Sequence, residues 1–229
     1  RGLGIFIIYL IFACFYAGLL IMMLQSIKKS GVSIVSNVLI LVIVPLTYDN
    51  AILGIGKWIG VGEVLENLNA ARFWLHAIFT PLLILFSWDV LKRAGVKWVN
   101  TTSAMLITVA FTLIAFLIEL FTVVWDLSLK AEKSYRILSY TSTSSPQGPP
   151  IMILMVTMAL LVSSSILWKR TGWYWMFVGT ALMIIGSMVK IPIESGAITN
   201  AFELILLISL VFTKRYQDRY QDNKRLAAG

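Results

Sequence analysis

Seven long apolar stretches constrain the fold of this chain more than any other sequence feature. They cover residues 3–26, 32–53, 71–91, 99–126, 150–168, 172–191 and 195–213. A helix needs about 20 mainly apolar residues to cross the roughly 30 Å of hydrocarbon in a bilayer. The sequence therefore predicts an all-α, polytopic integral membrane bundle of seven transmembrane helices. We expect residues 1–213 to form this single domain and residues 214–229 to form a basic cytoplasmic tail.

The composition excludes most soluble classes of protein. Of the 229 residues, 59% are hydrophobic and only 13% are charged, whereas soluble domains average about 45–50% and 25%. The polar residues are too few to cover a soluble globule, so a nucleic-acid-binding module and a disordered chain are excluded. A single cysteine, Cys14, also excludes a disulfide-stabilised secreted scaffold.

The basic residues predict which way the helices point. With the N-terminus outside, twelve of the nineteen Lys and Arg residues lie in the inner loops and the tail, and they cluster at helix ends. Cytoplasmic loops of membrane proteins are enriched in Lys and Arg. The expected topology is therefore N-terminus outside and C-terminus inside, which also accounts for the net charge of +8.

Ionisable residues inside the apolar stretches are the best guide to function, because each is costly in hydrocarbon unless it is paired or hydrated. Nearly all of them belong to the outer half of the predicted bundle, and Asp89 is the exception at the inner end. Counting about 1.5 Å per residue from Lys214 places Glu203 roughly 16 Å away, near the bilayer midplane. Glu119 is of similar interest because apolar residues surround it.

Helical spacing places several of these residues on shared faces. Arg72 and His76 are four residues apart, Asn200 and Glu203 are three apart, and Glu119 and Asp126 are seven apart, so each pair is expected on one face. Pro45 and Pro81 are expected to bend their helices at the same depth. These positions predict an outward-opening polar pocket. Its candidate catalytic residues are Asp49, His76, Glu119 and Glu203, and its candidate substrate-binding residues are Tyr48, Asn50, Arg72, Trp74, Trp125, Glu194 and Asn200.

Each of these residues also has a purely structural interpretation. Arg72 could be an interfacial anchor, His76 a helix-packing residue, and Glu63, Glu66 and Asp126 solvated helix ends. Two further segments are expected to be non-helical. The glycine-rich stretch 53–63 predicts an interfacial turn with Trp58 at headgroup depth, and the Ser/Pro-rich stretch 140–150 predicts a connector or a cover over the pocket.

The residue inventory narrows the chemistry. One histidine is too few for diiron or b-type haem sites, and none of the seven apolar stretches contains a DxxxD or DDxxD pair that would hold a magnesium diphosphate. Removal of a carboxyl group from water disfavours its charged form, and a neutral carboxylic acid is a proton donor at neutral pH. Aromatic faces nearby stabilise a developing cation. In size and helix number the layout is similar to the small integral-membrane terpene cyclases, although no motif of that family is matched.

We therefore expect an integral membrane enzyme that acts on a lipid or isoprenoid by carboxylate acid/base chemistry, such as protonation-driven cyclisation or isomerisation. Three alternatives stay open: a metal-assisted lipid hydrolase or transferase with Asp49, His76 and Glu119 as ligands, a proton-coupled transporter, and a non-catalytic membrane subunit or receptor. No cofactor is expected for the acid/base enzyme, whereas the metal-assisted hydrolase or transferase requires a divalent metal. The expected partners are a lipophilic small molecule and membrane lipids, with no nucleic acid. The sequence does not fix the oligomeric state.

Overall fold

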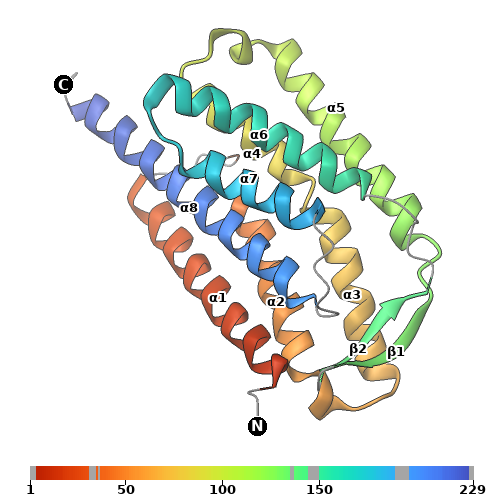
Figure 1. Ribbon diagram of the computed structural model, residues 1–229. Helices are drawn as coiled ribbons and strands as arrows, with labels where there is room; N and C mark the ends of the chain where they lie inside the picture. The colour runs from red at the N-terminus through yellow and green to blue at the C-terminus, as the bar shows by residue number, and fades with distance from the viewer. Residues whose placement is uncertain are drawn as a thin grey trace.

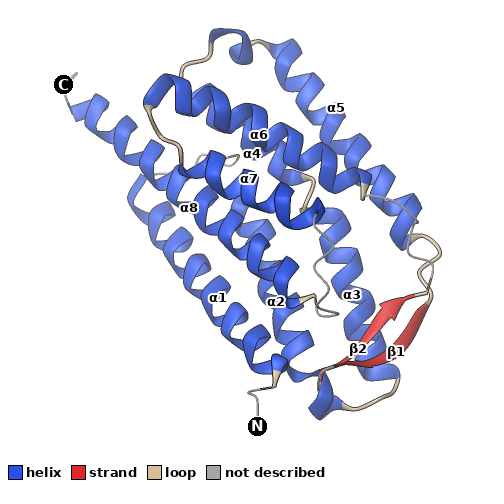
Figure 2. Cartoon of the chain, in the orientation of Figure 1, coloured by secondary structure: helices blue, strands red, loops and turns tan. Residues whose placement is uncertain are grey.

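The computed structural model describes residues 4–30, 35, 37–134, 137–143, 150–188 and 196–226. It is a bundle of helices with one β-hairpin (Figures 1 and 2). The helices are α1 (Ile5–Ser30), α2 (Val38–Ile59), α3 (Glu63–Phe79), α4 (Leu82–Arg93), α5 (Thr102–Glu119), α6 (Ile151–Thr171), α7 (Trp175–Met188) and α8 (Ala197–Leu226). A 3₁₀ turn (Lys97–Asn100) precedes α5, and a π-helical turn (Leu120–Val124) follows it.

The membrane-spanning character is evident from the helices. Within the described ranges, six helical segments are long and apolar enough to cross a bilayer, and α3 and α4 together form one of them over Glu63–Arg93. The seventh predicted span corresponds to α7, which has 14 described helical residues, or roughly 21 Å at 1.5 Å per residue. The chain is thus a multi-pass membrane protein by the length and composition of its helices, whereas the count of seven stays a prediction.

The glycine-rich stretch 53–63 is mostly helical, which corrects the expected turn. Helix α2 continues to Ile59, and α3 begins at Glu63, eight residues before the predicted span. Only the short connection bends, where Gly60 and Gly62 have φ values of 86° and 155° that residues with a Cβ rarely adopt. Two acidic side chains in the first turn of α3, Glu63 and Glu66, favour its start because they face the positive end of the helix dipole.

The main apolar core lies between α1, α2, α4, α6, α7 and α8. Its fully buried side chains include Tyr16, Phe86, Leu160 and Leu207. Helix α5 lies at the edge of the bundle (Figure 1) and exposes apolar residues such as Ile107, which is 68% exposed. An edge helix with an apolar outer face is stable where that face contacts lipid rather than water.

A β-hairpin at one end of the bundle was not predicted. Strands β1 (Leu129–Ser134) and β2 (Ile137–Ser142) pair in antiparallel register, with Glu132 opposite Ser139. The hairpin covers the end of the bundle near the N-terminus, whereas α8 ends at the opposite end (Figure 1). We call these the hairpin end and the α8 end. Leu138 and Tyr140 pack against Leu65 of α3 and Ile52 of α2.

Packing against helices is what stabilises this hairpin, because an isolated two-stranded hairpin is marginal in water. The backbone N–H of Gly62 donates to the Tyr140 hydroxyl at 3.1 Å. Gly56 of α2 lies so close to β2 that a Cβ on it would be 2.1 Å from the carbonyl oxygen of Leu138. The glycine therefore allows the strand to contact the helix directly.

Replacing Gly56 with alanine is expected to displace the hairpin. Since the obstructing atom is a backbone oxygen, it cannot move away as a side chain would, and overpacking of this kind costs about 1–3 kcal/mol. Thermal unfolding of purified G56A in detergent should show a lower Tm than the wild type. The matched control is G18A, because a Cβ on Gly18 of α1 meets no atom within 4 Å. An unchanged Tm for G56A would contradict this account of the hairpin.

Candidate functional site

A cavity of about 240 Å³ near the hairpin end brings together residues from α2, α3, α5 and α8. All four candidate catalytic side chains line it, together with two of the candidate binding residues. The polar and aromatic lining consists of Asp49, Arg72, Phe73, His76, Glu119, Asn200 and Glu203. We call this the carboxylate cavity. Helical spacing accounts for two of its pairs, because Arg72 and His76 share one face of α3, and Asn200 and Glu203 share one face of α8.

An ion pair between α2 and α3 organises one wall of this cavity. The Nε of Arg72 donates to Oδ1 of Asp49 at 2.6 Å, and its Nη1 donates to Oδ1 of Asn69 at 2.6 Å. Asn69 is fully buried, and its own amide nitrogen donates to the carbonyl oxygen of Leu65. The guanidinium is thus held at two nitrogens, and Arg72 is an ion-pair partner within the bundle rather than an interfacial anchor.

A second polar contact joins α2 to α8. The Nδ2 of Asn200 donates to Oδ1 of Asn50 at 3.0 Å, and Nδ2 of Asn50 donates to the carbonyl oxygen of Leu46 at 2.9 Å. Asn50 is fully buried and does not line the cavity. Because its amide oxygen and nitrogen are both used, Asn50 positions Asn200 and is not placed to contact a ligand.

Three titratable side chains of the carboxylate cavity are not engaged in polar contacts of this kind. Among the described residues, His76, Glu119 and Glu203 form neither a hydrogen bond nor an ion pair. Glu119 is 7% exposed, although it lies on the edge helix α5. Buried polar groups in proteins are nearly always hydrogen-bonded. The carboxyl groups of Glu119 and Glu203, which face the cavity without a described partner, are therefore available to a ligand.

The π-helical turn after Glu119 separates it from Asp126. In this turn the N–H of Trp125 donates to the carbonyl oxygen of Leu120, five residues earlier, at 2.8 Å. The wider turn changes the helical phase, so the expected shared face of Glu119 and Asp126 does not exist. Glu119 and Val123 line the cavity, whereas Asp126 is exposed. Isolated π turns are frequent at functional sites.

Several candidate binding residues do not line the carboxylate cavity. Trp74 is 43% exposed, because it lies two residues after Arg72 and so on another side of α3. Trp125 follows the π turn, is 65% exposed and packs against Phe121. The hydroxyl of Tyr48 donates to the carbonyl oxygen of Leu68 at 2.9 Å, which ties α2 to α3. Glu194 lies outside the described residues.

Sequence reasoning overlooked several polar residues near the site because they carry no charge. Asn69 is in this group, and so are two tyrosines of α1, Tyr9 and Tyr16, which are 3% and 0% exposed. The Tyr16 hydroxyl has no hydrogen-bond partner in the part of the chain that the structure describes. The signal in the sequence is two tyrosines spaced seven residues apart in an otherwise apolar helix.

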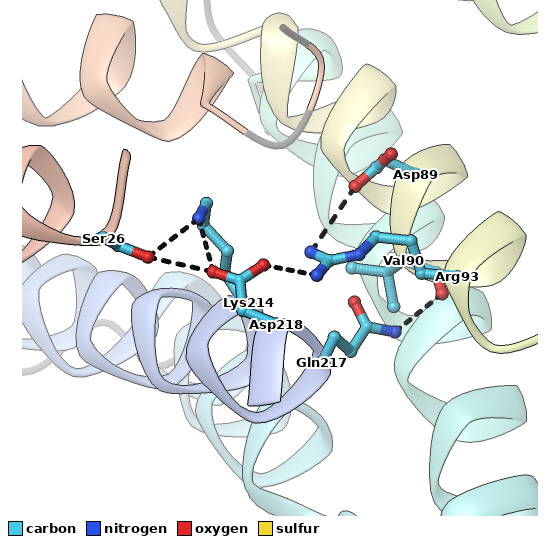
Figure 3. Close-up of polar contacts among 7 residues, drawn as sticks. All are labelled: Ser26, Asp89, Val90, Arg93, Lys214, Gln217 and Asp218. Atoms are coloured by element: carbon cyan, nitrogen blue, oxygen red, sulfur yellow. Dashed lines mark hydrogen bonds and ion pairs between the residues drawn. The ribbon is translucent and has the colours of Figure 1, made fainter. Parts of the chain in front are cut away.

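A second polar cluster lies at the α8 end of the bundle and ties three helices together (Figure 3). Asp218 of α8 pairs with Lys214 at 2.7 Å and with Arg93 of α4, and it accepts a hydrogen bond from Ser26 of α1 at 2.9 Å. Arg93 also lies 3.9 Å from Asp89. We call these five residues the three-helix clasp.

The sequence suggested that nearly all ionisable residues of the bundle lie in one half. The three-helix clasp corrects this expectation, because it places ionisable side chains at the α8 end as well. Helix α8 continues past residue 213 to Leu226, and Lys214 and Gln217 are buried. The side chain of Gln217 donates to the carbonyl oxygen of Val90 in α4 at 2.9 Å (Figure 3). Asp89 pairs with Arg93 rather than with Lys92, whose ammonium lies 5.0 Å from the Trp88 ring.

The described residues contain no group of three or more His, Cys, Asp or Glu side chains arranged to hold a metal ion. Comparisons with protein families, with curated proteins and with solved structures gave no match for this chain. The geometry of the carboxylate cavity is therefore the basis for any functional proposal.

Replacing Asp218 with asparagine is expected to destabilise the bundle strongly. The change leaves the buried cations Lys214 and Arg93 without their shared carboxylate, and breaking a buried ion pair from one side costs about 3–5 kcal/mol. Thermal or denaturant unfolding in detergent measures this loss. D222N, one turn further along α8, is the control, since Asp222 forms no ion pair among the described residues. Equal stabilities for D218N and D222N would mean that the three-helix clasp contributes little.

Proposed function

We propose that this protein is an integral membrane enzyme that acts on a lipid or isoprenoid by carboxylate general acid/base chemistry. The supporting observation is that Glu119 and Glu203, from different helices, face one cavity without a hydrogen-bond or ion-pair partner among the described residues. A carboxyl group in hydrocarbon without a paired cation is carried at the lowest cost as the neutral acid. That is the form that donates a proton.

The proposed reaction is a protonation-driven cyclisation or isomerisation. A carboxylic acid, Glu203 or Glu119, transfers its proton to an alkene carbon or an epoxide oxygen of the substrate, and a carbocation develops. The π electrons of another double bond form the new ring bond, or a neighbouring C–H bond supplies the electrons for a shifted double bond. Loss of a proton to a carboxylate completes the reaction, so the product has the elemental composition of the substrate.

The other cavity residues have distinct proposed roles. Asp49, paired with Arg72 at 2.6 Å, supplies a fixed negative charge that stabilises the carbocation. The ring of Phe73 offers a π face for the same purpose. His76 orients the substrate or carries the proton between the acids. The surrounding apolar side chains, such as Leu46 and Val123, exclude the water that would trap a carbocation as an alcohol.

The metal-assisted and transporter alternatives receive less support from the described residues. The metal-assisted interpretation lacks a ligand set, because Asp49, His76 and Glu119 do not form a metal-holding group. A transporter needs a polar route between the two ends of the bundle. On α8, residues 204–213 between Glu203 and Lys214 carry no ionisable side chain and include the buried Leu207, Leu210 and Val211, so an uncharged segment divides the carboxylate cavity from the three-helix clasp.

We further propose seven spans, with the hairpin end outside and the α8 end in the cytoplasm. Lys92 and Arg93 lie in the last turn of α4, Lys169 and Arg170 in the last turn of α6, Lys97 in the 3₁₀ turn, and Lys214 in the second half of α8. This concentration of positive charge at the α8 end is typical of a cytoplasmic face. The carboxylate cavity then lies toward the non-cytoplasmic leaflet.

The acids are tested by E203Q and E119Q, which keep the side-chain shape but remove the transferable proton. Membranes with the wild-type protein should contain a lipid that has the mass of a host lipid but a different retention time. Both variants should lower its yield at least about 100-fold, because general acid catalysis contributes roughly 10²–10⁴-fold. Liquid chromatography with mass spectrometry of lipid extracts measures the yield. D126N, at an exposed acid outside the cavity, should retain it.

Loss of folding would also abolish the product, so the amount and Tm of each purified variant are measured in parallel. An undiminished yield in both glutamine variants would overturn the proposed acid chemistry.

The orientation is tested with single cysteines in a background where Cys14 is replaced by serine. K130C in β1 should react with a membrane-impermeant thiol reagent added to intact cells, whereas K97C in the 3₁₀ turn should react only after the cells are permeabilised. Both lysines are exposed, so burial does not limit either reaction. The opposite labelling pattern would reverse the topology.

A further inference from the structure

A second cavity, of about 270 Å³, lies beneath the β-hairpin and adjoins the carboxylate cavity. Three residues, Arg72, Phe73 and Asn200, line both. We call this second cavity the hairpin cavity. Each cavity alone is smaller than the roughly 300–1,000 Å³ of small-molecule sites, whereas the two together fall within that range. A ligand of ordinary size would therefore occupy both.

The two cavities differ in their polar groups. The hairpin contributes four hydroxyl-bearing residues to the lining of the hairpin cavity, namely Ser134, Ser139, Tyr140 and Thr141, and α1 adds Tyr9. Among the described residues, the side chains of Ser134 and Ser139 have no hydrogen-bond partner. The hairpin cavity is thus equipped to hydrogen-bond a polar group, while the adjoining cavity presents the carboxyl groups.

The charges of the lining residues indicate which polar group fits. Arg72 is the only cation among the described residues that line either cavity, and Asp49 and Asn69 already engage its guanidinium. Glu132 adds a further carboxylate to the hairpin cavity, where it accepts a hydrogen bond from Thr141 at 2.9 Å. Among the described lining residues, a phosphate or diphosphate would therefore meet carboxylates and no cation that is free of an ion pair. Such like-charge contacts are strongly unfavourable in a low-dielectric site.

We propose that the hairpin cavity binds the head of a neutral, hydroxyl- or carbonyl-bearing lipid, and that the chain of this lipid places its reactive group in the carboxylate cavity. This assignment rests on the proposed function, because it identifies the substrate class for the same site. Ser139 and Ser134 hydrogen-bond the head, and the charge of the lining excludes prenyl diphosphates and phospholipid headgroups. The cation Lys130 lies on the same face of the hairpin as Glu132, but it does not line the hairpin cavity and so supplies no positive charge to it.

Binding of head groups is tested with ligands that share a tail. Oleyl alcohol, oleyl phosphate and oleylamine differ only in the head, and geranylgeraniol with geranylgeranyl diphosphate repeats the comparison on an isoprenoid tail. The purified full-length protein in detergent is titrated with each, and ligand-induced thermal stabilisation gives the apparent Kd. At least one of the two alcohols should bind at least about tenfold more tightly than the phosphorylated ligand with the same tail. Oleyl alcohol should also bind more tightly than oleylamine by the same factor.

Two variants locate the head. S139L fills the hairpin cavity and should weaken alcohol binding at least tenfold, whereas S139A removes one hydroxyl and should weaken it about three- to tenfold, the value of one hydrogen bond. The control is A131L, which adds the same side chain at an exposed position of β1 that does not line the cavity. Each variant's Tm without ligand shows whether it is folded. If S139L is not folded, S139A alone tests where the head group binds.

The outcomes separate this proposal from the proposed function. E203Q should bind the alcohol as the wild type does while forming no product. Preferred binding of the phosphorylated or cationic ligand, binding of neither alcohol, or wild-type alcohol affinity in S139L and S139A would overturn the head-group assignment. That assignment stands and the acid chemistry fails if the serine variants lose alcohol binding but E119Q and E203Q retain product formation.

Discussion

The ion pair between Asp49 and Arg72 is the interaction on which the arrangement at the hairpin end depends. A charge inside a membrane bundle is tolerated only with a partner or with water, so neither residue could occupy its place without the other. Their contact joins α2 to α3 and places the arginine between two cavities. Within the described part of the chain, this pair also occupies the one cation that lines the two cavities, so Glu119 and Glu203 have no counter-ion there and the described lining is unsuited to anions.

The convergence of Asp49, Arg72, His76, Glu119 and Glu203 could be predicted from the sequence because charged groups in apolar helices must turn toward the protein interior. Helical spacing then placed Arg72 with His76 and Asn200 with Glu203. The same reasoning failed for Asp126, because periodicity assumes a regular helix and the π turn interrupts it. It also passed over Asn69 and Tyr16, since a neutral polar side chain gives no comparable signal in an apolar run.

Long-range packing accounts for the other features that the sequence did not reveal. The strand Leu129–Ser134 carries three charged residues and resembles a loop, and it becomes a strand because β2 packs on α2 and α3. The basic composition of residues 214–229 predicts a tail, yet Lys214 and Asp218 have partners on α1 and α4. Helix α8 consequently carries ionisable groups near both the carboxylate cavity and the three-helix clasp, with an uncharged stretch between them, which suits a site that admits a lipid from one side.

The π turn at Leu120–Val124 has a further consequence for how this chain tolerates changes in length. A π turn contains about one residue more than the α-helical turn it replaces. Deleting one residue there would restore the regular ladder and leave Glu119 where it is, while the deletion of one residue earlier in α5 would rotate every preceding side chain by about 100° relative to the cavity. The segment after the buried glutamate is therefore where a one-residue change in length is most simply accommodated.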